Sequence, residues 1–91
     1  MDATVRDNAE RRRYEMDTEA GIAFATYRVE GATILVTHSE VPVALRGRGF
    51  GDKLVKGMLD LARIQGRKVV PLCGFVATYM RRHPEYADIA G

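Results

Sequence analysis

The chain has 91 residues, of which 46% are hydrophobic and 29% charged, and its formal net charge is +2. This length predicts one domain spanning residues 1–91, and the ordinary composition excludes a disordered or low-complexity protein. No apolar run approaches the roughly 20 residues that cross a bilayer, and the first residues lack a signal-peptide pattern. We therefore expect a cytoplasmic protein without a membrane partner. The single cysteine, Cys73, excludes an internal disulfide.

The first half of the chain has the patterning of β-strands. Strands are expected at residues 5–8, 13–17, 22–29 and 33–41, with turn-forming clusters that contain Gly21 and Gly31 between them. In the third strand, Ile22, Phe24 and Thr26 share one face. Short hairpins between consecutive strands predict an antiparallel meander.

Helical spacing begins after Pro42. An amphipathic helix is predicted at residues 49–65 by a stripe of apolar side chains: Leu54, Met58, Leu61 and Ala62. The apolar run 68–72 predicts a buried strand, and a second helix is expected from about residue 75 to just before Pro84. A helix between two strands permits a parallel crossover. The expected fold class is therefore α+β, with a mixed, mostly antiparallel sheet of about five strands and two helices.

A glycine-rich turn stands between the fourth strand and the first helix. It contains Arg46, Gly47, Arg48, Gly49, Phe50, Gly51 and Asp52. The first N–H groups of a helix are unpaired, glycines let the backbone approach an anion, and arginines bind phosphate bidentately. The turn therefore predicts a phosphate or pyrophosphate site. The dinucleotide fingerprint fails because its third glycine would fall on Asp52, no Walker spacing occurs, and a purely structural turn is the alternative.

The same residues carry a family resemblance. Arg46-x-x-Gly49-x-Gly51 resembles the R/Q-x-x-G-x-G/A motif of the GNAT superfamily, the acetyl-coenzyme A-dependent N-acetyltransferases. With residues 38–42, 70–73 and 79–86, the chain resembles the small YjdJ-type subgroup over about residues 27–86. In that superfamily the turn holds the pyrophosphate, and the pantetheine arm lies between two splayed strands, here 33–41 and 68–72. The resemblance implies that acetyl-coenzyme A or coenzyme A contacts Glu40, Val41, Arg46, Gly47, Arg48, Gly49, Phe50, Gly51 and Asp52.

Two side chains are candidates for catalysis, and no metal ligand set is expected. His38 shares a face with Glu40 if its strand is extended, pointing away from Thr37 and Ser39. Cys73 precedes the second helix, whose N–H groups lower a thiol pKa. The subgroup resembles enzymes with a cysteine facing the acyl thioester, which implies that Cys73 accepts the acetyl group with help from His38. Direct transfer is equally compatible, and the alternatives are a structural histidine and a small core cysteine.

The chain departs from the superfamily's pattern in two places. The N-x-x-A-x-x-x-Y pattern that supplies an acid is lost, since Arg81 stands where the tyrosine would be; Tyr79 is therefore expected to be a core aromatic packed near Phe75. Only residues 9–12 separate the first two strands, where typical members carry two helices that help to bind the acceptor. The acceptor, the acyl length and the oligomeric state, monomer or homodimer, therefore stay open.

Three functions compete on these grounds. The first is transfer of an acetyl group from acetyl-coenzyme A to an amine of a small-molecule or protein acceptor. The second is a non-catalytic module that binds or senses acyl-coenzyme A, which the reduced acceptor region favours. The third, nucleic-acid binding, draws on the basic run at residues 11–13, but no binding motif supports it and no nucleic-acid partner is expected.

Overall fold

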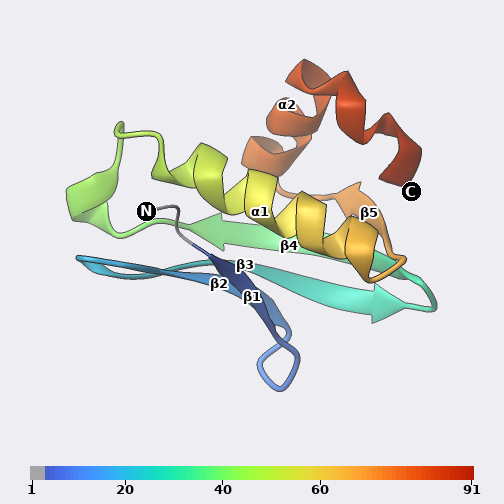
Figure 1. The fold of residues 1–91 in the computed structure, drawn as a ribbon, viewed down its shortest axis with the longest axis horizontal. Helices are drawn as coiled ribbons and strands as arrows, with labels where there is room; N and C mark the ends of the chain where they lie inside the picture. The colour runs from blue at the N-terminus through green and yellow to red at the C-terminus, as the bar shows by residue number, and fades with distance from the viewer. Residues whose placement is uncertain (1–3) are drawn as a thin grey trace.

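The computed structural model describes residues 4–91. Its sheet has one side covered by two helices, and α1 lies along the sheet with α2 beside it (Figure 1). Short 3-10 turns occupy Val43–Leu45 and Pro84–Ile89. The remaining elements are β1 (Val5–Asn8), β2 (Arg13–Thr18), β3 (Gly21–Glu30), β4 (Thr33–Glu40), α1 (Phe50–Ile64), β5 (Lys68–Pro71) and α2 (Gly74–Arg82).

The sheet follows chain order, β1-β2-β3-β4-β5. Its first four strands pair antiparallel, and β5 pairs parallel to β4 because α1 provides the crossover between them. The expected α+β class, with a mixed sheet of five strands and two helices, is confirmed. The helix bounds differ from those predicted by one residue at each end of α1.

The core lies between the helices and the near face of the sheet. Ala23, Ala25 and Tyr27 of β3 point into it, beneath the apolar stripe of α1. Ile22, Phe24 and Thr26 share a face, as expected, but it is the face of the sheet that points away from the helices, where Ile22 is exposed. Alternation along a strand explains both sets, since neighbouring side chains point to opposite faces.

A bulge in β4 reverses this alternation near the end of the strand. Tyr27 pairs with Val36 and Thr26 with His38, so Thr37 lies between them with no residue of β3 opposite it in the register. An extra residue in one strand exchanges the faces of every side chain after it. Ser39 therefore points to the helix side, opposite the buried Ala25.

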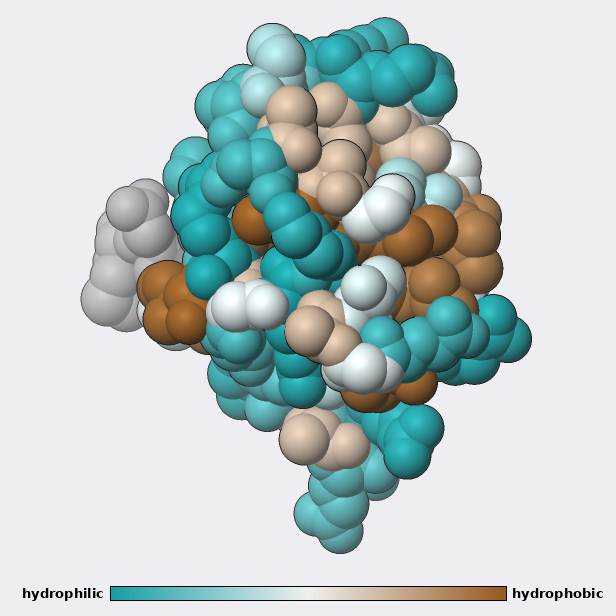
Figure 2. All heavy atoms as spheres, turned by 90° about the vertical axis from the view of Figure 1, so that its right-hand side faces the viewer, coloured by the Kyte–Doolittle hydropathy of each residue, from teal (hydrophilic) through white to brown (hydrophobic). Residues whose placement is uncertain are grey.

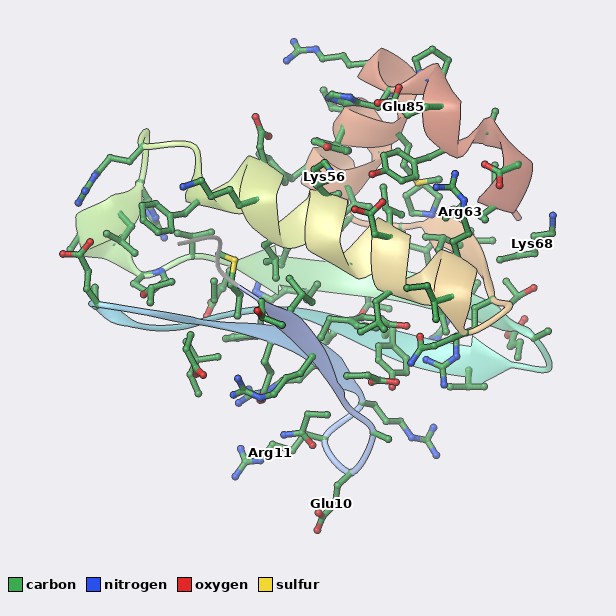
Figure 3. The ribbon with its side chains drawn as sticks, viewed as in Figure 1. Glu10, Arg11, Lys56, Arg63, Lys68 and Glu85 are labelled. Carbon is green, nitrogen blue, oxygen red and sulfur yellow. The ribbon has the colours of Figure 1, made fainter. Side chains whose placement is uncertain are left out.

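The end of the molecule remote from the start of α1 carries several exposed apolar groups. Figure 2 shows this end, where apolar groups interrupt a mainly hydrophilic surface. Val29 and Ile64, near the ends of β3 and α1, are large exposed apolar residues. At this end of the molecule, Arg63 of α1 reaches the C-terminal segment (Figure 3) and pairs with Asp88 at 2.6 Å. No helix within residues 4–91 is long and apolar enough to span a bilayer.

Candidate active site

The parallel strands β4 and β5 separate at Val36. Their pairing ends with Val36 opposite Pro71, although β4 continues to Glu40. The carbonyl of Val36 accepts hydrogen bonds from the N–H groups of Leu72 and Cys73, at 2.9 and 3.0 Å, where the chain leaves β5 for α2. The last four residues of β4 therefore have no β5 partner, which gives the divergence expected for residues 33–41 and 68–72.

A cleft of about 550 Å³ opens at this divergence. The end of β4, the glycine-rich turn and the start of α1 form its walls, with one side chain from α2. Eight of the nine residues expected to contact the cofactor line it: Glu40, Val41, Arg46, Gly47, Gly49, Phe50, Gly51 and Asp52. The ninth, Arg48, instead approaches Glu19 of the β2–β3 turn at 3.8 Å and stacks over the Phe50 ring at 5.6 Å.

The start of α1 presents unpaired backbone donors to the cleft. Gly49 is the N-cap, its φ of 81° lies in the left-handed region that glycine favours, and no side chain caps the helix. The first helical hydrogen bond runs from Lys53 N–H to the Gly49 carbonyl. Within residues 4–91 the N–H groups of Phe50, Gly51 and Asp52 therefore have no hydrogen-bond partner. Such a helix start is suited to binding an anion.

Phe75 of α2 forms an apolar wall of the cleft that was not predicted from the sequence. Its ring lies against the backbone of Gly51, where an added Cβ would come within 2.8 Å of Phe75 Cζ. The Phe75 side chain is nevertheless 47% exposed and lines the cleft. A glycine in the first turn of the helix is thus required for the present position of this ring. Ser39, Leu45 and Leu54 are further lining residues that were missed.

His38 lies on the rim of the cleft, on the outer face of the sheet. Its Nε2 is 3.4 Å from Glu40 Oε1, which confirms that these two residues share a face. The imidazole is also tilted against the Phe24 ring, with 6.4 Å between ring centroids. Both His38 and Glu40 have more than half of their side chains exposed. The imidazole is therefore accessible to a molecule that approaches from solvent.

Cys73 lies at the N-cap of α2 and contacts Ser39, not His38. Cys73 Sγ is 3.2 Å from Ser39 Oγ, and the described residues contain no hydrogen bond between Cys73 and His38. The expected help from His38 to Cys73 stays a prediction, and the side chain found at the thiol is Ser39, because the bulge at Thr37 turns Ser39 to the helix side. Burial raises the pKa of the Cys73 thiol, but the Ser39 hydroxyl and the backbone N–H groups at the start of α2 outweigh it and hold this pKa below its ordinary value.

Tyr79 is a core residue, as expected. It is 7% exposed and stacks on His83, with ring centroids 3.9 Å apart, whereas Phe75 faces the cleft. Burial raises the pKa of the Tyr79 phenol. No group of three potential metal ligands is arranged for a metal ion within residues 4–91.

Known proteins share this fold. A solution structure of a GCN5-like putative N-acetyltransferase from Staphylococcus aureus superimposes with a TM-score of 0.72, covering 96% of this chain and 86% of that one at 24% identity. This likeness concerns the fold. The family model described as GCN5-related N-acetyl-transferase matches residues 13–89. The chain therefore belongs to the GCN5-related N-acetyltransferase family.

Curated relatives share part of this sequence. The protein NATD1 of Mus musculus is 33% identical over 63 residues, which cover 68% of this chain and 57% of that protein. The protein NATD1 of Xenopus tropicalis is 33% identical over 52 residues, 57% of this chain and 48% of that protein. The chain thus spans about half the length of the curated relatives it matches.

Proposed function

We propose that this chain binds acetyl-coenzyme A in the cleft and transfers the acetyl group to an amine of a small-molecule or protein acceptor. One observation carries the proposal. Three unpaired N–H groups at the start of α1 stand at the end of a cleft that follows the divergence of β4 and β5. Family membership gives this cleft its expected ligand.

The proposed contacts follow from the lining of the cleft. The amides of residues 50–52 and the guanidinium of Arg46 receive the pyrophosphate, because both offer donors to an anion. Arg48 joins them after it leaves Glu19, an exposed ion pair that contributes little to stability. The backbone of Glu40 and Val41 receives the pantetheine arm. The bound molecule supplies an activated acyl thioester.

Cys73 and His38 take separate roles in this proposal. Cys73 lies where the strands diverge and has a lowered pKa, so it is the nucleophile for a covalent route. His38, exposed on the rim beside Glu40, is the base for the acceptor amine. Direct transfer from the thioester to the amine needs His38 alone. The two routes therefore differ in their dependence on Cys73.

Calorimetric titration with coenzyme A and acetyl-coenzyme A tests the cofactor before any acceptor is chosen. Arg46→Ala is expected to weaken binding by about tenfold, since a charge-assisted hydrogen bond contributes roughly 1.5 kcal/mol or more. Arg82→Ala, which removes an exposed arginine outside the cleft, is the matched control and is expected to bind as the wild type does. Absence of binding at millimolar concentrations of either compound refutes the proposal.

Turnover is then measured with a panel of amines as coenzyme A release. Cys73→Ala and His38→Ala are each expected to retain cofactor affinity. Loss of turnover in both variants supports the covalent route, and loss in His38→Ala alone supports direct transfer. If both variants keep wild-type turnover, the catalytic assignment is wrong.

A non-catalytic acyl-coenzyme A sensor is the second candidate. The observation that favours it is the tight β1–β2 hairpin, in which Arg11 N–H donates to the Asn8 carbonyl and Arg12 N–H to the Ala9 carbonyl. No helix stands at this place, where typical members of the superfamily bind the acceptor. A sensor binds coenzyme A with wild-type affinity yet acetylates none of the amines.

Several finer assignments belong to the same proposal. We assign the chain to the small YjdJ-type subgroup on the likeness of residues 38–42 and 70–73. We expect one domain spanning residues 1–91 that acts in the cytoplasm as a monomer or homodimer, without membrane or nucleic-acid partners. In the basic run, Arg11 is at the tip of a hairpin (Figure 3), and Arg13 pairs with Glu15, which leaves less uncompensated charge for a phosphate backbone.

A further inference from the structure

Ser39 is the side chain that the fold brings to the Cys73 thiol. Its Oγ lies 3.2 Å from Cys73 Sγ, and the residue also lines the cleft. The backbone at Cys73 is held against β4, because the Val36 carbonyl accepts hydrogen bonds from the N–H groups of Leu72 and Cys73. The two side chains therefore meet at the point where β4 and β5 part.

We propose that Ser39 is a positioning residue, whose hydroxyl donates a hydrogen bond to the Cys73 sulfur and stabilises it as a thiolate beside the cleft. This inference rests on the proposed function in assigning Cys73 to acetyl transfer; the hydrogen bond itself belongs to the free protein. In the covalent step a bond forms between Cys73 Sγ and the acetyl carbon while the bond from that carbon to the coenzyme A sulfur breaks. The proton lost by the Cys73 thiol ends on the coenzyme A thiol.

The surroundings of the sulfur make this hydroxyl decisive. The groups that act most on the thiol are neutral: the Ser39 side chain and backbone and the N–H groups of Phe75 and Val76. Within residues 4–91, no charged side chain is hydrogen-bonded to the sulfur. The charged side chains of the neighbouring elements are His38 and Glu40 on β4, Asp52, Lys53, Lys56, Asp60 and Arg63 on α1, Lys68 on β5, and Arg81 and Arg82 at the far end of α2. Without the Ser39 hydroxyl, the thiolate keeps only the amides of α2 and the backbone of residue 39 against the opposing effect of burial.

Alkylation of the single cysteine by iodoacetamide reads the thiolate directly. The rate is measured against pH on the protein without coenzyme A, for the wild type and Ser39→Ala. Because the thiolate is the reacting species and a hydrogen bond to a charged group is worth about one pKa unit, the variant is expected to react roughly tenfold more slowly below its pKa. The limiting rate at high pH is expected to stay the same. A profile that is unmoved, or that moves to lower pH because the thiol was the donor, overturns the proposal.

Two further comparisons separate this effect from a structural one. The side chains introduced by Ser39→Thr and Ser39→Val have nearly the same shape, and only threonine carries a hydroxyl. Ser39→Thr is therefore expected to retain the wild-type rate profile and Ser39→Val to lose it. This pair tests the role of the hydroxyl if Ser39→Ala does not fold. Thr37→Ala removes a hydroxyl that bonds Thr26 at 3.0 Å and is expected to leave the profile unchanged. Coenzyme A titration of the wild-type protein tests the cofactor separately. Failure of any coenzyme A binding refutes the proposed function and leaves the alkylation result standing, whereas normal binding with an unmoved profile refutes the role of Ser39.

Discussion

Gly57 is the point at which α1 rests on the edge strand β1, and replacing it with alanine tests how tightly the two are held. An added Cβ would come within 2.9 Å of Val5 Cβ. Alanine favours the helix by about 1 kcal/mol over glycine, whereas overpacking costs about 1–3 kcal/mol. Asp7 ties β1 to its neighbours, since it accepts hydrogen bonds from Tyr27 at 2.6 Å and from Arg67 at 3.2 Å. Because β1 cannot withdraw easily, Gly57→Ala is expected to lower the free energy of unfolding by about 1–2 kcal/mol, and Tm by roughly 5–15 °C.

Urea denaturation followed by circular dichroism measures this change, with Val5→Ala as the second arm of a double-mutant cycle. Removing the Val5 methyl groups clears the space that the new Cβ needs, so the double variant is expected to be at least about 1 kcal/mol more stable than the sum of the single effects. Gly74→Ala is the matched control, because a Cβ at the start of α2 meets no atom within 4 Å. The reasoning fails if Gly57→Ala stabilises the protein or if the two changes are additive.

Three further predictions concern titration and the glycine-rich turn. Burial raises the pKa of Tyr14 to about 12, above its unfolded value near 10, so the free energy of unfolding is expected to fall as pH rises beyond 10. Phenolate absorbance that rises at the same pH with and without denaturant contradicts this expectation. Burial raises the pKa of the Glu15 carboxyl, but its hydrogen bonds from Arg13, Asn8 and Arg6 lower it more, so it stabilises the fold above its unfolded pKa and loses this effect as pH falls through the folded value. Glu15→Gln is therefore expected to lower stability at neutral pH and to flatten its acid dependence, and an unchanged slope argues against the cluster. Gly49→Ala and Gly66→Ala both place a Cβ at positive φ, costing about 1–2 kcal/mol each, but only the former is expected to weaken coenzyme A binding in a calorimetric titration; equal affinities exclude the turn from the site.

Periodicity predicted most of the fold, because the regular elements bury one face each. The apolar stripe of α1 and the turn residues around Gly21 and Gly31 determined the order and type of the elements. The glycine-rich turn could also be predicted from the sequence, because the left-handed φ of Gly49 and the uncapped helix start require glycine. Phe75 gave no such signal: its position depends on how closely α2 approaches Gly51, a distance that only the folded chain defines.

The side chain beside the Cys73 thiol was not predicted from the sequence, for a different physical reason. Ile34 and Val36 face the core, and strict alternation from them carries His38 to the same side. The sheet contains one more residue in β4 than in β3 at this place, so Ser39 takes that side instead. Threonine is an ordinary strand residue, and nothing in its side chain marks Thr37 as the bulge. The bulge at Thr37 lies where β4 loses its β5 partner and the cleft begins. The alternation of apolar and polar residues that predicts β4 therefore fails at the residues proposed to carry the chemistry.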